Sequence, residues 1–228
     1  MATSRRSALV GNRWALAGAV IYLLEWVAII AAHATQPPAK PEAMVAYYSA
    51  RSIAYPLMAT WFSLVLPGRI LYVAGLRHAL RRSGYESVLA DMALAAMAVS
   101  VVIEVARYAL SAAAAQVAHL GDVSAVIALD AGGHWLNAMV VIPFGVAVAS
   151  AAAAQRQSRL FPAWLVWGGL ASGLVVILDG FVGSLTLAGV TMPQILAVPN
   201  FAVPVAWIWM IATGVVLWRS TPASMPRS

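Results

Sequence analysis

The sequence contains no cysteine and few charged residues, and each shortage excludes a class of protein. Without cysteine, the chain has no disulfide bond, no cysteine-ligated zinc or iron–sulfur site, and no thiol nucleophile. Charged residues make up 10% of the chain, whereas a soluble globular domain carries about 25%. The hydrophobic residues, 62% of the chain, fall instead in blocks of about twenty, the length that crosses a bilayer. The chain is therefore expected to be an integral membrane protein.

The apolar blocks predict an all-α protein of one domain, residues 1–228, built as a bundle of six transmembrane helices. The predicted spans are Trp14–Ala32, Ile53–Leu76, Val88–Val117, His134–Ala154, Ala163–Leu187 and Phe201–Trp218. A short amphipathic stretch, Val123–Leu129, is expected at the membrane interface before the fourth span. Residues 1–13 and 219–228 form short tails.

Lysine and arginine residues are distributed unevenly between the two sides of this predicted bundle. Of the fourteen, Arg69 and Arg107 fall within spans, and only Lys40 and Arg51 fall on one side. The other side receives Arg5, Arg6, Arg13, Arg77, Arg81, Arg82, Arg156, Arg159, Arg219 and Arg227. The positive-inside rule then places both termini in the cytoplasm of a multi-pass protein of the bacterial inner membrane. Because the basic residues form no stripe, membrane lipid rather than nucleic acid is the expected partner.

Charged side chains at hydrocarbon depth are costly, and they mark functional sites in membrane proteins. Glu25 in the first predicted span, Glu104 and Arg107 in the third, and Asp179 in the fifth all fall at mid-depth or nearer the outer side. Three carboxyl groups that share one fixed positive charge cannot all stay ionised in a low-dielectric interior. At least one of them is therefore expected to hold a proton near neutral pH. Arg69 is expected to differ, because its long side chain can reach water at the cytoplasmic end.

Helical periodicity gives the third predicted span one polar stripe, which must face the bundle interior rather than lipid. Its members are Ser100, Glu104, Arg107, Tyr108 and Ser111. The alternative to a functional stripe is an ion pair between Glu104 and Arg107 that only stabilises packing. In the fifth span, Gly169-x-x-x-Gly173 predicts close contact with a neighbouring helix.

Aromatic and amide residues near the predicted acids are candidates for lining a substrate cavity. Deep aromatic rings can stabilise a cation, although packing against neighbours explains any single ring as well. The predicted lining residues are Tyr22, Trp26, Trp61, Asn137, Asn200 and Trp207. At the outer mouth, a zinc site built from His33, His119, His134 and Asp130 stays an alternative. The favoured prediction includes neither a metal ion nor a cofactor.

From Arg51 onward, several short motifs follow one another in a distinctive order. They are Arg51-Ser52-Ile53, Leu76-Arg77-His78-Ala79-Leu80, the Glu104 and Arg107 pair, Ser158-Arg159-Leu160-Phe161-Pro162-Ala163-Trp164-Leu165, Gly168-Gly169 and Ile177-Leu178-Asp179. This order resembles a bacterial family of six-span integral membrane proteins known as a domain of unknown function. The resemblance implies a six-helix bundle with aspartate at position 179, and it implies no activity. The proline-containing loop after the first span departs from the family pattern.

The first hypothesis for function is an enzyme within the membrane that acts on a small lipophilic, isoprenoid-like substrate. Glu25, Glu104 and Asp179 would serve as general acids and bases for cyclisation or isomerisation. Arg107 would keep one carboxylate ionised, and Tyr108 would orient it. Small integral-membrane terpene cyclases are similar in kind, because they use carboxylates inside a helix bundle.

Two further hypotheses stay open. A proton-coupled transporter of small molecules would use the same carboxyl groups. Against it, the sequence shows no internal repeat and no span broken by glycine or proline at the midplane, whereas many transporters have both an internal repeat and broken helices. Dimerisation would supply the missing symmetry, so a homo-oligomer stays open. The third hypothesis is an accessory or sensory membrane protein whose polar core is purely structural.

Overall fold

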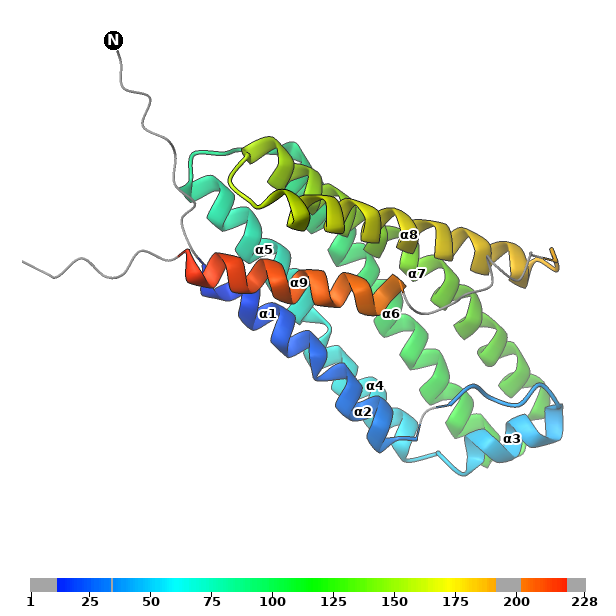
Figure 1. Ribbon diagram of the computed structural model, residues 1–228. Coiled ribbons are helices and arrows are strands. Elements are labelled where there is room, and N and C mark those ends of the chain that lie inside the picture. Colours follow the sequence, from blue (N-terminus) through cyan, green and yellow to red (C-terminus); the bar gives the residue numbers. More distant parts are fainter. Residues whose placement is uncertain (1–11, 34, 192–201, 221–228) are drawn as a thin grey trace, which may run out of the picture.

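The computed structural model describes residues 12–33, 35–191 and 202–220 (Figure 1). The regular secondary structure in these ranges is helical, without a strand, and short turns and loops connect the helices. The helices are α1 (Arg13–Leu23), α2 (Glu25–Ala31), α3 (Pro41–Ser49), α4 (Ala54–Val65), α5 (Pro67–Arg82), α6 (Val88–His119), α7 (Val123–Ser158), α8 (Ala163–Leu187) and α9 (Ala202–Arg219). The predicted all-α class is therefore confirmed for the described residues. Asn200 lies outside them.

The long apolar helices overlap the predicted spans, and the largest difference is in α7, which begins at Val123 rather than at His134. Five stretches are long and apolar enough to cross a membrane: Arg13–Ala31, Ala54–Arg82, Val88–His119, Val123–Ser158 and Ala163–Leu187. A shorter apolar helix, Val203–Arg219, occupies the place of the sixth predicted span. The first two stretches each consist of two consecutive helices, α1 with α2 and α4 with α5.

Two local predictions were wrong. Val123–Leu129 is not a separate interfacial stretch, because it forms the first turns of the continuous helix α7. Asp122 caps this helix by accepting a hydrogen bond from the Ala125 backbone N–H at 3.0 Å, which lowers the pKa of the Asp122 carboxyl. The expected proline-containing loop includes the helix α3, in which Pro41 occupies the first turn. Proline is tolerated there because the first turn needs no backbone N–H donor.

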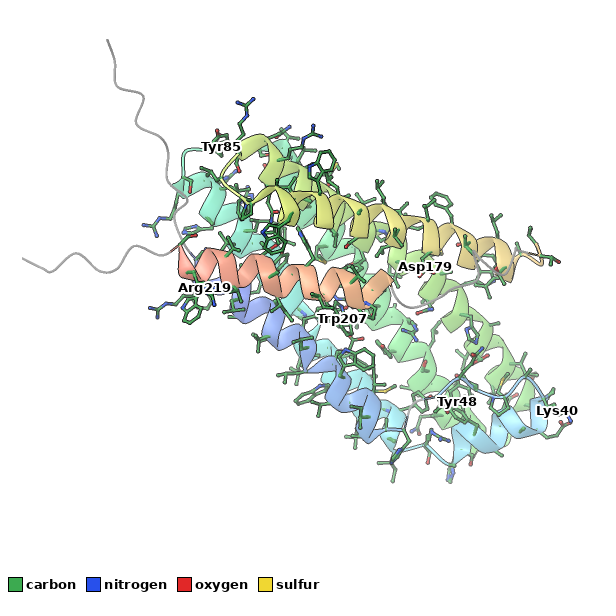
Figure 2. All side chains as sticks on the ribbon, in the orientation of Figure 1. Lys40, Tyr48, Tyr85, Asp179, Trp207 and Arg219 are labelled. Atoms are coloured by element: carbon green, nitrogen blue, oxygen red, sulfur yellow. The ribbon has the colours of Figure 1, made fainter. Side chains whose placement is uncertain are left out.

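The ends of the bundle differ in charge. Close packing brings the start of α1 beside the second half of α5 and the end of α9. The Asn12 side chain donates to the Gly75 carbonyl at 3.0 Å, and the Asn12 backbone N–H donates to the Leu217 carbonyl at 3.2 Å. We call this the basic end, and it carries Arg13, Arg77, Arg81, Arg82, Arg156, Arg159 and Arg219. The α3 end lies opposite; Figure 2 labels Arg219 at the first and Lys40 at the second.

Glycines allow two pairs of helices to approach closely. A Cβ atom at Gly173 of α8 would lie 2.6 Å from the Ala149 backbone nitrogen of α7, so the predicted close contact in the fifth span is confirmed. A Cβ at Gly18 of α1 would lie 2.5 Å from the Gly68 carbonyl oxygen of α5. Because the two backbones are this close, no side chain fits between them at this point. The two glycines therefore fix where α1 contacts α5. The sequence had not predicted this second contact.

Candidate functional site

Both of the first two membrane-length stretches are interrupted beside a charged residue. Helix α1 ends at Leu23 and α2 begins at Glu25, with one residue between them. Helix α4 ends at Val65 and α5 begins at Pro67, whose missing N–H prevents a continuous hydrogen-bond ladder. Leu24 and Leu66 keep right-handed helical backbone angles, so each break is a one-residue irregularity within a membrane-length stretch rather than an unwound segment. Glu25 opens α2, and Arg69 lies in the first turn of α5.

Trp61 supports the first of these breaks. Its indole Nε1–H donates to the Leu24 carbonyl at 2.8 Å, which satisfies a backbone group at the interruption between α1 and α2. The Trp61 ring lines an apolar groove of about 490 Å³ between α2 and α4. Because this groove contains none of the predicted acids, the prediction that Trp61 shares their cavity was wrong.

Arg69 forms the centre of a buried ionic cluster. Its side chain is 3% exposed, and its Nη1 atom lies 2.5 Å from Oε2 of Glu104. Its Nη2 atom lies 3.6 Å from Oε2 of Glu25. One guanidinium group therefore faces two carboxyl groups that come from the first and third spans. Buried charges persist in this way only when they are paired.

The expectation that Arg69 reaches water was wrong because of the close α1–α5 contact. Gly68 packs against the Gly18 backbone, and this contact places the next residue, Arg69, inside the bundle. The aromatic rings of Tyr22 and Phe144 flank the guanidinium group, with centroids 4.0 and 4.9 Å from its central carbon. Tyr22 was predicted to line the cavity, but its ring packs against the Arg69 guanidinium and is not part of the cavity wall.

Arg107 does not have the partner that the sequence suggested. Among the described residues no carboxylate oxygen lies within 4.0 Å of its guanidinium nitrogens, and Glu104 pairs with Arg69 instead. The Arg107 guanidinium lies 4.7 Å from the ring centroid of Tyr108. The alternative interpretation, an ion pair of Glu104 with Arg107 that only stabilises packing, was therefore wrong. Arg69 takes the place that was assigned to Arg107.

Glu25 is held more loosely than Glu104. Its Oε1 atom accepts a hydrogen bond from the Tyr108 hydroxyl at 3.3 Å, and the Tyr108 ring stacks on Phe62 at 3.7 Å. Its Oε2 atom has no hydrogen-bond partner in the described part of the chain. An incompletely paired buried carboxylate is costly. Of the two glutamates, Glu25 thus makes the longer and weaker ion pair with Arg69.

A cavity of about 580 Å³ lies next to the ionic cluster. Its polar wall is formed by Glu25, Gln36, Arg69, Glu104, Arg107, His134, Asn137 and Asp179. Its apolar wall is formed by Trp26, Ile29, Val140, Val141, Phe144, Val203, Pro204 and Trp207. The structure thus brings carboxyl groups of the first, third and fifth spans to one cavity, together with two arginines. The roles that the sequence assigned to these groups stay predictions.

Asp179 lies in the part of this cavity that α8 contributes. It is half-buried, and it makes no hydrogen bond or ion pair with any other residue in the described ranges. Trp207 of α9 and Trp26 of α2 line the same cavity, with ring centroids 5.1 Å apart and ring planes at 87°. Figure 2 labels Asp179 and Trp207 on their separate helices. Asn137 of α7, also predicted from the sequence, belongs to the same wall.

A smaller pocket of about 250 Å³ lies between the cavity and α3. The Tyr48 hydroxyl of α3 donates to Oδ1 of Asp130 at 2.7 Å, and Oδ2 of Asp130 lies 3.4 Å from Nε2 of His134. Burial, with the nearby Asp130 carboxylate, raises the pKa of Tyr48 well above its usual value. His134 and Arg107 line both spaces. Within the described residues, no three histidine, aspartate or glutamate side chains gather as a metal site.

No family model matches the chain, and no curated protein or solved structure matches it either. The resemblance to a six-span family therefore stays a prediction. The fold and the cavity define an all-α protein with membrane-length helices and a charged internal site.

Proposed function

We propose that this protein is a proton-coupled transporter of small molecules with six spans and cytoplasmic termini in a bacterial inner membrane. The observation that carries this proposal is the ionic cluster of Glu25, Arg69 and Glu104 beside two one-residue helix breaks. Transporter sites often lie where membrane helices depart from regular geometry, because backbone groups and nearby charges can contact a solute there. The two breaks weaken one of the two objections that the sequence raised against transport, and the other is the lack of an internal repeat in the sequence.

The charges of the cavity support proton coupling. Three carboxyl groups, Glu25, Glu104 and Asp179, share the cavity with two guanidinium groups, Arg69 and Arg107. A site with one more acid than base becomes neutral when it binds a proton or another cation, and neutrality is favoured away from water. A proton and a solute can therefore stabilise the same site in turn.

Glu25 is the proposed proton-binding group. When ionised, it attracts Arg69 from 3.6 Å and holds the α2 break near the α5 break. When protonated, it loses most of that attraction, while Glu104 keeps its contact with Arg69 at 2.5 Å. Proton binding thus changes the force between the first and second spans. A transporter needs such a link between occupancy and helix position.

The position of the cavity fits one state of an alternating-access cycle. Towards the basic end, the interior is filled by buried side chains that include Tyr72, Leu76, Met97 and Met210. Towards the α3 end, the cavity adjoins the pocket at Tyr48. Transport would require the filled side to open after the α3 side closes. A purely structural polar core explains less, because it needs no cavity of about 580 Å³ beside its charges.

The test is transport by the protein reconstituted into liposomes on a solid-supported membrane. Decylammonium, decanoate and small neutral solutes are applied with and without a pH gradient. We expect at least one of them to produce a current that depends on the gradient and disappears in Glu25→Gln. Glu42→Gln is the matched control, because Glu42 is exposed in the first turn of α3. Absence of a pH-dependent current in the wild-type protein contradicts transport.

The apolar wall of the same cavity favours a second candidate, the membrane-embedded isomerase or cyclase. The Glu25 carboxyl would add its proton to a carbon–carbon double bond, and the resulting carboxylate would accept a proton from an adjacent carbon, so that a double bond forms at a new position. Trp26 and Trp207 would stabilise the cationic intermediate. Incubation with isoprenoids in heavy water tests this reaction. Solvent deuterium in the recovered isomer, absent with Glu25→Gln, supports the enzyme, and an unlabelled pool opposes it.

A further inference from the structure

We propose that the cavity binds a lipophilic ammonium ion, with the charged nitrogen held by Asp179 and the rings of Trp26 and Trp207, and the apolar part along Val140, Val141 and Phe144. The ammonium ion is the substrate class of the proposed transporter. Only the claim that this ligand is transported rests on the proposed function. The binding itself follows from the cavity wall.

The charged groups of the cavity are unevenly paired. Arg69 is committed to Glu104 at 2.5 Å and faces Glu25 at 3.6 Å. Arg107 follows Glu104 by one helical turn and lines the same space, so these two arginines and two glutamates balance each other. Asp179 is the carboxyl left over, and within the described chain it has no ion pair or hydrogen bond. A positively charged ligand would complete the balance.

Two tryptophan rings line the same cavity as the polar groups. Trp26 and Trp207 meet nearly at right angles, so they present ring surfaces in two directions. The Tyr22 ring packs edge-on against Trp207 with centroids 4.9 Å apart, which fixes the orientation of the indole. Ring faces attract ammonium groups, and tryptophan attracts them most strongly. A carboxylate and two tryptophans that line one cavity are therefore suited to an organic cation.

The cavity is large enough to hold the apolar part of a ligand. Val140, Val141 and Phe144 add aliphatic and aromatic surface from α7. The volume of about 580 Å³ lies within the range of small-molecule sites, which is about 300–1,000 Å³. An anionic amphiphile of the same size would increase the excess of negative charge, and a neutral one would leave Asp179 unpaired. The wall thus favours the cation over both.

The experiment compares decylammonium, decanol and decanoate, which share one alkyl chain and differ in charge. Binding to the purified protein in a non-ionic detergent is followed by tryptophan fluorescence. We expect decylammonium to bind about tenfold more tightly than decanol, the gain from an ion pair with cation–π contact. Decanoate is expected to bind more weakly than decanol. Equal affinities for all three would overturn the proposal.

Asp179→Asn is expected to abolish the preference for the ammonium ion over the alcohol. Asp122→Asn is the matched control, because Asp122 caps α7 outside the cavity and asparagine caps equally well. Preference retained by Asp179→Asn overturns the proposal. If that variant does not fold, Trp26→Leu provides a second test, since the partly exposed Trp26 is not needed for the core. Its preference is expected to fall severalfold, and an unchanged preference again overturns the proposal.

Binding in detergent and transport in liposomes fail independently. An ammonium preference that depends on Asp179, without a proton-coupled current, leaves the ligand class standing and rejects transport. A proton-coupled current for decanoate alone supports transport and rejects the ammonium site.

Discussion

Removal of Arg69 is expected to destabilise the protein more than any other single change in the ionic cluster. Arg69→Gln leaves two buried carboxyl groups, Glu25 and Glu104, without their shared counter-ion. Breaking one partner of a buried ion pair costs about 3–5 kcal/mol, because an uncompensated charge stays behind. Arg77→Gln is the control, since Arg77 and its partner Asp91 are 29% and 49% exposed. Exposed pairs of this kind contribute about 0–1 kcal/mol.

The measurement is a double-mutant cycle of Arg69→Gln and Glu104→Gln, with the free energy of unfolding taken from denaturant titration in mixed micelles. Because the Nη1–Oε2 distance is 2.5 Å, the loss in the double variant should be smaller than the sum of the two single losses by about 2 kcal/mol or more. Glu25→Gln should cost about 1 kcal/mol, since glutamine can keep the hydrogen bond from Tyr108. Additive single losses, or a loss in Arg69→Gln no larger than in Arg77→Gln, would refute the buried pairing.

Three further predictions concern the scaffold. Gly18→Ala should cost about 1–3 kcal/mol by forcing α1 from α5, whereas Gly168→Ala, with no heavy atom within 4 Å of the new Cβ, should cost nothing measurable in thermal unfolding. Trp61→Phe should cost about 0.5–1.5 kcal/mol through the lost hydrogen bond to Leu24, seen as a lower melting temperature with unchanged ligand binding. The pKa of Asp122 is lowered in the folded protein. The stability that this carboxylate contributes is therefore complete above the unfolded-state pKa and is lost as pH falls through the folded-state pKa. Asp122→Asn should remove this dependence when the free energy of unfolding is measured across the acid range.

Much of the fold was predictable because membrane-spanning helices consist of long apolar runs. Hydropathy located the long apolar helices, although α7 begins at Val123 rather than at the predicted His134. Counting residues along each predicted span placed the internal charges at mid-depth or nearer the outer side. Glu25, Glu104 and Asp179 could be expected in one interior because each would be costly in lipid. Trp26 and Trp207, predicted as deep aromatic residues, and Asn137, predicted near the outer mouth, do line the cavity.

The ionic cluster itself was not predictable from residue spacing. Sequence reasoning paired Glu104 with Arg107 because they are three residues apart on one helix, but the stronger partner, Arg69, comes from another span. Its inward direction depends on the tertiary contact of Gly68 with Gly18. The available signal was Pro67-Gly68 directly before Arg69, a pair that breaks a helix and permits close packing.

The most direct test of the central claim is infrared difference spectroscopy of the protein across a pH titration, which reports protonated carboxyl groups by their carbonyl stretching band. If Glu25 exchanges the proton while Arg69 keeps Glu104 ionised, a band that appears on acidification in the wild-type protein should vanish in Glu25→Gln. The same band should persist in Asp122→Asn. A band that survives in Glu25→Gln and disappears in Glu104→Gln would contradict the claim.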